Sequence, residues 1–282
     1  VQTGNTKTLK TWLTELDNNP TQLEKFIQSR NHQLLGSYFE CLWQFFFTFG
    51  PNWQLLKDHF QVSGSETNEN GKSSPTKTMG ELDILAEDDQ QQAWHIELAV
   101  KFFLKLPDVS GAEPEHWVGP QSRDRLDKKL NKLSLKQFPF LNEPVTQRAL
   151  QEQSLIKKWK QGLLLKGYLF KPKNQEYELP SSVPNTARLS TWCHIRDLGL
   201  TIPRHSYYVL LPKHEWLGPY YGLHIDVWDF PTMIENAKQH FQSSENKYAL
   251  MIAQVDKFKD NWIEKNRWLV VHNEWPKPIK QP

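Results

Sequence analysis

The sequence predicts an α/β protein with a mixed central sheet flanked by helices, and three features indicate this class. A strongly apolar helix is expected at residues 33–47. Two strands follow at residues 81–86 and 94–104, and the polar turn between them predicts an antiparallel hairpin. Further amphipathic helices and short strands come after the hairpin, so helices and strands alternate along the chain.

The N-terminal third supplies the helices that precede this hairpin. Residues 8–49 are interpreted as two helices, because apolar side chains recur at helical spacing and Pro51 marks a break. Residues 53–62 predict a short element that passes from helix to strand. Residues 63–78 are polar and without periodicity, which indicates a solvated loop between hairpin strands.

After the hairpin, a helix is expected from Gln121 to about Ser134. Three leucines define its buried side, and four polar residues lie opposite: Leu126, Leu130 and Leu133 against Gln121, Arg125, Lys128 and Lys132. A polar helix at 145–161 and a strand at 163–170 come next. Strands at 207–211, 223–228, 250–255 and 268–271 and a helix within 231–241 complete the chain. We expect a core at residues 1–172 and a C-terminal α+β extension at 173–282, continuous with the core or a subdomain of its own.

Composition excludes several classes of function. No apolar run reaches the roughly 20 residues that span a bilayer, and the first residues lack the layout of a secretion signal, so a cytoplasmic protein is expected. The two cysteines, Cys41 and Cys193, cannot form a disulfide framework or a cysteine zinc site. The sequence has no glycine-rich phosphate loop, no serine-hydrolase elbow and no histidine pair at zinc-hydrolase spacing. A net charge of only +2 allows a local nucleic-acid-binding patch without requiring one.

The hairpin carries the residues that suggest chemistry. Trp94, Ile96, Leu98 and Val100 fall on one face of the second strand, and His95, Glu97, Ala99 and Lys101 fall on the other. Asp83 lies on the neighbouring strand, and carboxylates on adjacent strands can hold a divalent metal ion. Glu40 is the one acid within the apolar helix and is a candidate third ligand. This pattern predicts a metal-dependent nuclease, in which a lysine steadies developing phosphate charge.

Each of these residues also has a structural interpretation. Glu81 and Asp83 could be exposed edge residues, and Glu97 with Lys101 could be a solvated ion pair of little energetic value. Gln121, Arg125, Lys128 and Lys132 could be the wet face of an amphipathic helix, with phosphate contact as the second interpretation. His95 could be a general base or an outer-shell donor, or a satisfied structural histidine.

Together these segments resemble a known family. The order of these motifs resembles the PD-(D/E)xK nuclease superfamily, in particular its RecB-like branch. The motifs are a helix with Glu40, a strand with Gly80-Glu81-Leu82-Asp83, a strand with Glu97 followed by Lys101, and a helix opened by Gln121. Six further segments resemble the bacterial domain-of-unknown-function family 1853, which is assigned to that superfamily. They are 35–40, 80–85, 97–102, 117–120, 123–130 and 165–170.

This resemblance implies a restriction-endonuclease-like core that uses Mg²⁺ or Mn²⁺ to cleave nucleic acid, with DNA as the expected substrate. By position, Asp83, Glu97 and Lys101 would be catalytic, and Glu40, Asp83 and Glu97 would bind metal, with the Leu98 carbonyl as an extra ligand. Gln121, Arg125 and Lys128 would bind substrate. Two departures from the pattern stand out. The lysine expected two residues after Glu97 is replaced by Ala99 and lies at Lys101, and Arg125 replaces the helix tyrosine.

The alternative hypothesis is a catalytically inactive nuclease-fold protein that binds nucleic acid or a protein partner through the same cleft. Metal titration separates the two, because only the enzyme needs Glu97 for Mn²⁺ binding. A purely structural protein would show neither property.

Overall fold

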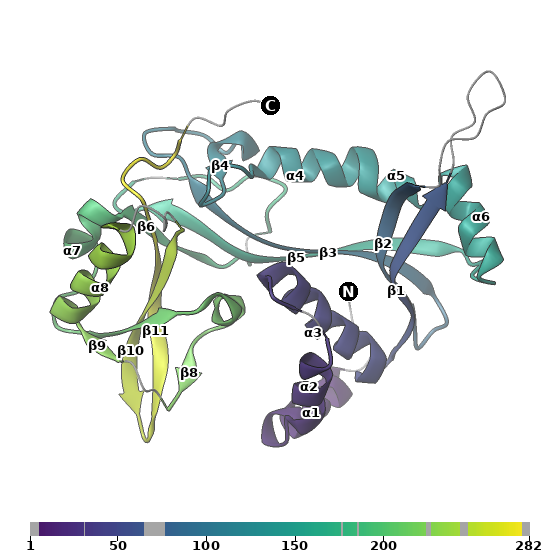
Figure 1. Ribbon diagram of the computed structural model, residues 1–282, viewed down its shortest axis with the longest axis horizontal. Coiled ribbons are helices and arrows are strands. Elements are labelled where there is room, and N and C mark those ends of the chain that lie inside the picture. The colour runs from purple at the N-terminus through teal and green to yellow at the C-terminus, as the bar shows by residue number, and fades with distance from the viewer. Residues whose placement is uncertain are drawn as a thin grey trace. The chain divides into compact units, whose positions relative to one another are not determined.

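The computed structural model describes residues 6–30, 32–64, 77–175, 177–184, 186–223, 227–242 and 248–277. They form a mixed α/β protein in which a large mixed sheet is flanked by helices (Figure 1). The chain divides into two compact units, Val1–Val100 with Asn131–Leu165 and Lys101–Leu130 with Lys166–Pro282. Strands β3 (Ala93–Lys105) and β5 (Trp159–Pro172) therefore contribute residues to both units. A domain boundary at residue 172 stays a prediction.

Three helices open the first unit, where two were expected. They are α1 (Thr6–Asn18), α2 (Thr21–Gln28) and α3 (Leu35–Phe49), and Pro20 directly precedes α2. Because proline has no N–H to donate and its ring clashes with a preceding helical turn, it separates α1 from α2. Aromatic rings join the three helices, with the Phe45 ring centroid 6.0 Å from that of Trp12 and 5.4 Å from that of Phe26.

The predicted hairpin is confirmed and extended by one strand. Strands β1 (Trp53–Gly64), β2 (Lys77–Asp88) and β3 pair antiparallel, so residues 53–62 are strand throughout and not part helix. In the first unit the hydrogen-bonded order is β1-β2-β3-β5. Residues 63, 64, 77 and 78 belong to β1 and β2, and the rest of the expected loop, 65–76, lies outside the described residues.

Short helices cover the β1–β2 hairpin. They are α5 (Phe138–Phe140) and α6 (Pro144–Glu152), whose side chains Phe140 and Leu150 pack with Phe60, Val62 and Leu82. The helix expected at 145–161 ends at Glu152, because Ser154 adopts a left-handed backbone (φ 57°) that terminates it. The chain then enters β5.

The second unit contains the other strands, in the order β5-β6-β11-β10-β7-β9. Its β5–β6 and β6–β11 pairs are parallel, whereas β11–β10, β10–β7 and β7–β9 are antiparallel. The strands are β6 (Leu189–His194), β7 (Tyr207–Leu211), β9 (Trp228–Asp229), β10 (Leu250–Phe258) and β11 (Asn261–Val271), with β4 (Trp117–Val118) on β3 and β8 (Tyr221–Gly222) on β11. The helices are α4 (Leu126–Lys132, which continues into the first unit), α7 (Leu198–Thr201) and α8 (Phe230–Gln242). Single 3₁₀ turns lie at Pro114–His116, Ile195–Asp197 and Lys213–Leu217.

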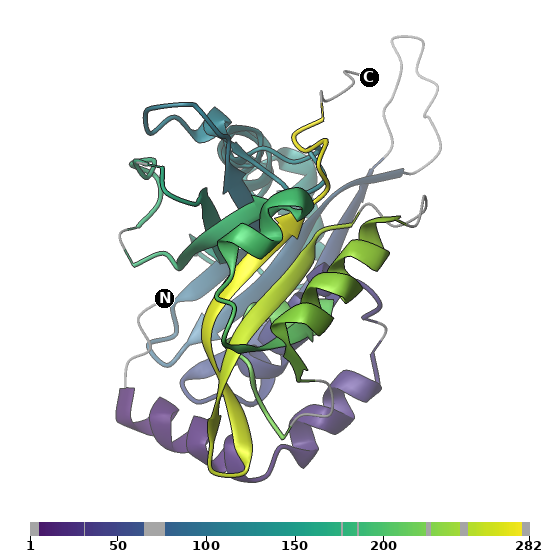
Figure 2. The same cartoon turned by 90° about the vertical axis from the view of Figure 1, so that its left-hand side faces the viewer.

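Most predicted elements of this unit are confirmed. The strands expected at 207–211, 250–255 and 268–271 and the helix within 231–241 are present, whereas β6 was missed. Of the strand expected at 223–228, only Trp228 is in a strand, Leu223 is not, and 224–226 lie outside the described residues. Helix α8 lies alongside the β10–β11 hairpin (Figure 2), where Met233, Ala237 and Phe241 pack against Leu250 and Ile252.

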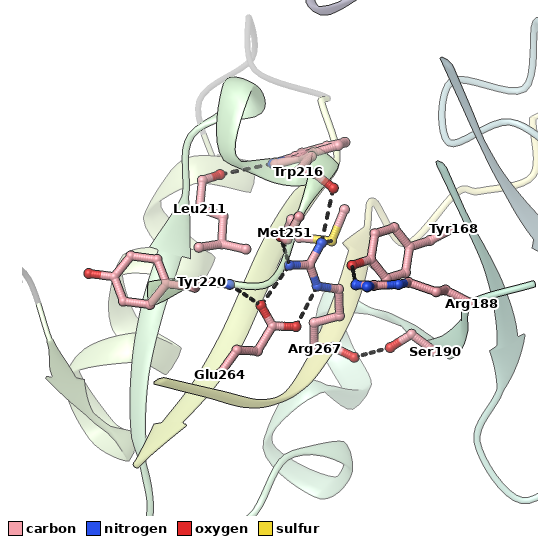
Figure 3. Close-up of polar contacts among 10 residues, drawn as sticks. Tyr168, Arg188, Ser190, Leu211, Trp216, Tyr220, Met251, Glu264 and Arg267 are labelled. Carbon is pink, nitrogen blue, oxygen red and sulfur yellow. Dashed lines mark hydrogen bonds and ion pairs between the residues drawn. The ribbon is translucent and has the colours of Figure 1, made fainter. Parts of the chain in front are cut away.

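A buried arginine organises the polar part of this unit (Figure 3). Arg267, only 4% exposed, donates two hydrogen bonds of 2.6 Å to the Glu264 carboxylate. It also donates to the Trp216 carbonyl (3.0 Å) and the Gly218 carbonyl (2.6 Å), and its guanidinium lies 4.4 Å from the Tyr168 ring centroid. A buried ion pair is tolerated only when its donors find acceptors in this way. The cluster thus fixes the turn around Gly218 against β11.

Among the residues that the structure describes, no helix is both long and apolar enough to cross a bilayer.

Candidate functional site

Asp83 and Glu97 lie in the first unit, at the point where the β2–β3 ladder ends. The last registered pairs are Leu85 with His95 and Ile84 with Ile96, and the two acids are one position further along each strand. Here the Leu98 N–H donates to Asp83 Oδ2 (2.8 Å). Because cross-strand partners share a face, the two carboxylates belong to the same face of the sheet.

The electrostatics of Asp83 reflect this placement. Burial makes the largest contribution to raising the pKa of Asp83, and the neighbouring Glu97 charge raises it further. The hydrogen bond from Leu98 lowers this pKa, and the charges of Glu40 and Glu81 raise it. The resulting pKa is about 7. Among the described residues, neither Asp83 nor Glu97 forms an ion pair with a lysine or arginine. The pair is therefore a concentration of negative charge without a compensating strong base. Asp83 is not the exposed edge residue of the structural interpretation.

Two side chains contact the Glu97 carboxylate, one at each oxygen. Its side chain is 1% exposed, His95 Nε2 lies 3.0 Å from Oε1, and Gln137 Nε2 donates to Oε2. Gln137 ends a π-helical turn, Leu133–Gln137, that continues α4. Sequence reasoning placed the site glutamine at Gln121 and missed Gln137.

A signal for Gln137 existed in the sequence. Leu126, Leu130 and Leu133 define the buried stripe of the expected helix, and position 137 continues that stripe at the same spacing. A polar residue at a position that the pattern reserves for the core indicates either a buried hydrogen bond or the end of the helix. Here both hold.

A second acidic group surrounds His59. Its Nδ1 lies 2.6 Å from Glu81 Oε1, and its Nε2 lies 3.8 Å from Glu40 Oε2. The pKa of Glu40 is raised overall, because burial and the Glu81 charge raise it by more than the His59 charge lowers it. Burial would lower the pKa of His59, but the hydrogen bond to Glu81 and the charges of Glu81, Glu40 and Asp58 raise it overall. Sequence reasoning did not single out His59, although Glu81 shares a strand face with Asp83.

Lys101 belongs to the second unit, where it forms an ion pair with Asp124 (Nζ to Oδ2, 2.7 Å). The alternative of a solvated Glu97–Lys101 ion pair is therefore wrong, because Glu97 is buried and Lys101 pairs with Asp124.

Gly167 of β5 lies close to the backbone of Lys101 in β3, which explains why a glycine occupies this position. A Cβ on Gly167 (φ +133°) would lie 1.8 Å from the Lys101 carbonyl oxygen.

The prediction of a polar helix face that begins at Gln121 is wrong, because Gln121 and Arg125 precede the helix. Gln121 is exposed in a turn, because Ser122 has a left-handed backbone (φ 58°) and Gly119 N–H bonds the Asp124 carbonyl (2.8 Å). The helix begins only at Leu126. Arg125 is held by Asp127 through two 2.7 Å hydrogen bonds. Lys128 is exposed on α4, so these three side chains do not share one helix face.

The donor set can be tested against a divalent metal ion. Within the described ranges, no three His, Cys, Asp or Glu side chains are arranged to hold an ion together, so Glu40 is not brought into a ligand set with Asp83 and Glu97. However, Mg²⁺ commonly binds through one or two carboxylates and keeps several waters. A buried and a half-buried acid with no lysine or arginine beside them fit that mode. Asp83 and Glu97 would hold such an ion, and Glu40 stays a prediction as a ligand.

Fold and site define a mixed α/β protein whose first unit carries a largely buried acidic pair where the β2–β3 ladder ends. The chain belongs to the family described as domain of unknown function DUF1853, whose model matches residues 2–271. No curated protein and no solved structure matches the chain.

Proposed function

We propose that the first unit is a restriction-endonuclease-like core and that the protein is a Mg²⁺- or Mn²⁺-dependent nuclease acting on DNA. One observation carries the proposal. The buried Glu97 and the half-buried Asp83 form a pair of carboxylates, with the Asp83 pKa raised to about 7 by burial and by Glu97. A site that holds two acids together at this cost in stability is a candidate functional site.

The residues of the pair have different tasks in this proposal. Glu97, held by His95 and Gln137, is the fixed ligand, and Asp83 is the ligand that loses a proton when the ion binds. A bound divalent ion would supply Lewis-acid activation of water and of the phosphoryl oxygen. Glu40 and Glu81 add negative charge close to Asp83 and so favour cation binding.

A cleavage assay tests this function. Single- and double-stranded DNA and RNA are incubated with the full chain and Mg²⁺ or Mn²⁺, alongside the variants Asp83→Asn and Glu97→Gln. We expect metal-dependent cleavage of DNA and a loss of at least about 100-fold in each variant, equivalent to about 3 kcal/mol of transition-state stabilisation.

The matched control is Asp89→Asn, because Asp89 is an exposed acid in the β2–β3 turn. It should cleave at the wild-type rate. Wild-type protein without activity on any substrate, or full activity in Asp83→Asn, would contradict the proposal.

A second function, a catalytically inactive nuclease-fold protein that binds nucleic acid or a protein partner, is favoured by a different observation. The position two residues after Glu97 is the buried Ala99, and Lys101 is already neutralised by Asp124. Such a protein would bind DNA with equal affinity in EDTA and in Mn²⁺ and with a steep dependence on salt concentration. The enzyme would instead bind Mn²⁺ with an affinity that collapses in Glu97→Gln.

A further inference from the structure

A chain of hydrogen bonds lies behind Glu97, inside the first unit. It starts at the Phe138 carbonyl, passes through the Gln161 amide to the His95 ring, and ends at the Glu97 carboxylate. His95 and Glu97 are essentially inaccessible, with side chains 0% and 1% exposed. Because water does not reach the ring, its protons are determined by its protein partners.

The chemistry of these groups decides where each proton lies. A backbone carbonyl can only accept, so the Gln161 atom 2.8 Å from the Phe138 oxygen is the amide nitrogen. The same NH₂ group lies 3.3 Å from His95 Nδ1 and points its second proton there. Nδ1 therefore accepts, and the ring proton of a neutral His95 lies on Nε2. From Nε2 it is donated to Glu97 Oε1 over 3.0 Å.

The other Glu97 oxygen is also occupied. Gln137 Nε2 donates to Oε2, so each oxygen of the carboxylate accepts from a side-chain donor. Two donors on different oxygens fix the plane of the carboxylate as well as its direction. The donors come from β3 and the π-helical turn, which makes the orientation of Glu97 a property of packed secondary structure.

We propose that His95 is a positioning residue, which Gln161 fixes as the Nε2–H tautomer so that it orients the Glu97 carboxylate for cation binding beside Asp83. The proposal deepens the nuclease assignment and rests on it for the cation. It assigns a task to a histidine that would otherwise be a satisfied core residue. Outer-shell donors of this kind commonly control ligand orientation and affinity in metal sites.

The first test needs no metal. In ¹⁵N NMR spectra of the metal-free full chain at pH 7.5, we expect His95 as a neutral ring protonated at Nε2. In Gln161→Leu the ring should show a mixture of tautomers, whereas Gln151→Leu, which changes an exposed glutamine on α6, should leave the spectrum unchanged. A His95 protonated at Nδ1 in the wild type, or an unchanged tautomer in Gln161→Leu, would overturn the proposal.

The second test measures Mn²⁺ affinity by electron paramagnetic resonance. His95→Leu should weaken binding by about 10–100-fold, and His95→Gln, which can place an NH₂ group near the former Nε2, should recover most of that loss. Gln161→Leu should lose several-fold and Gln151→Leu nothing. Thermal denaturation without metal reports any purely structural effect of the same substitutions.

A purely structural His95 predicts that melting temperature falls in His95→Leu while the Mn²⁺ affinity of the folded protein stays at the wild-type value, and that result would overturn the proposal. If His95→Leu does not fold, the Gln161→Leu affinity decides the question. Absence of Mn²⁺ binding in the wild type would instead refute the nuclease assignment, and the tautomer measurement would still decide the hydrogen-bond chain.

Discussion

Asp83 carries the clearest energetic signature at the scale of single residues. Its carboxyl is partly buried beside Glu97, and burial together with the Glu97 charge raises its pKa to about 7 from 3.8. The folded state therefore holds the Asp83 proton more tightly than the unfolded state does. This contribution to stability is fully present below pH 3.8 and is lost as the pH rises through about 7. The loss is on the order of 4 kcal/mol.

Replacing Asp83 with asparagine removes this titration. The amide oxygen that Asp83→Asn introduces still accepts from the Leu98 N–H, and the repulsion of Glu97 disappears. We expect the variant to be more stable than the wild type by about 2–4 kcal/mol at pH 8 and by little at pH 4.5. Urea denaturation across this pH range measures the difference between the two proteins. Parallel stability curves would contradict the assignment of the titration to Asp83.

Residue patterns predicted part of this site. Strand alternation placed Glu97 and His95 on one face, and the structure confirms that arrangement. Gln121 was the wrong glutamine, because the helix starts only at Leu126; the leucine stripe that begins there leads to Gln137. The contact between Glu40 and His59 could not be predicted, because His59 lies in β1, a segment expected to be partly helical.

At the scale of elements, Gly167 allows a close approach of β5 to β3. Its backbone is left-handed (φ +133°), and a methyl group there would lie 1.8 Å from the Lys101 carbonyl oxygen. Gly167→Ala should therefore cost at least about 3 kcal/mol, since both the strained backbone and the clash with a rigid strand oppose it. Chemical denaturation measures this loss.

Gly36→Ala is the matched control for that substitution. Gly36 lies in α3 with an ordinary backbone, and a Cβ there meets nothing within 4 Å. Because alanine forms helix more readily than glycine, this variant should be unchanged or up to about 1 kcal/mol more stable. Equal losses in both variants would show that the close approach at Gly167 is absent.

Element boundaries depended on backbone conformations that composition does not reveal. The left-handed residues Ser122 and Ser154 moved one helix start and ended another helix early, and neither is a glycine that would have indicated a break. Strand β6 was missed because the surrounding prolines suggested a loop. It is a strand because it pairs in parallel with β5 and with β11, and its partners in β11 lie far away in the sequence.

At the scale of the whole molecule, the chain passes from one compact unit to the other three times, within β3, α4 and β5. A contiguous core ending at residue 172 was the natural expectation, because local patterns change there. Long-range strand pairing is not encoded in local periodicity, so local patterns predict the α/β class more directly than they predict which strands pair. The acidic pair nevertheless lies entirely within one unit, as do the groups that hold it.

The central claim is that Asp83 and Glu97 together bind a divalent cation. A crystal structure of the full chain grown with Mn²⁺ at pH 8, with anomalous diffraction data, tests this most directly. We expect an anomalous peak bonded to one oxygen of Asp83 and one of Glu97, with His95 and Gln137 still donating to Glu97. An empty site at saturating Mn²⁺, or a peak that contacts neither carboxylate, would contradict it.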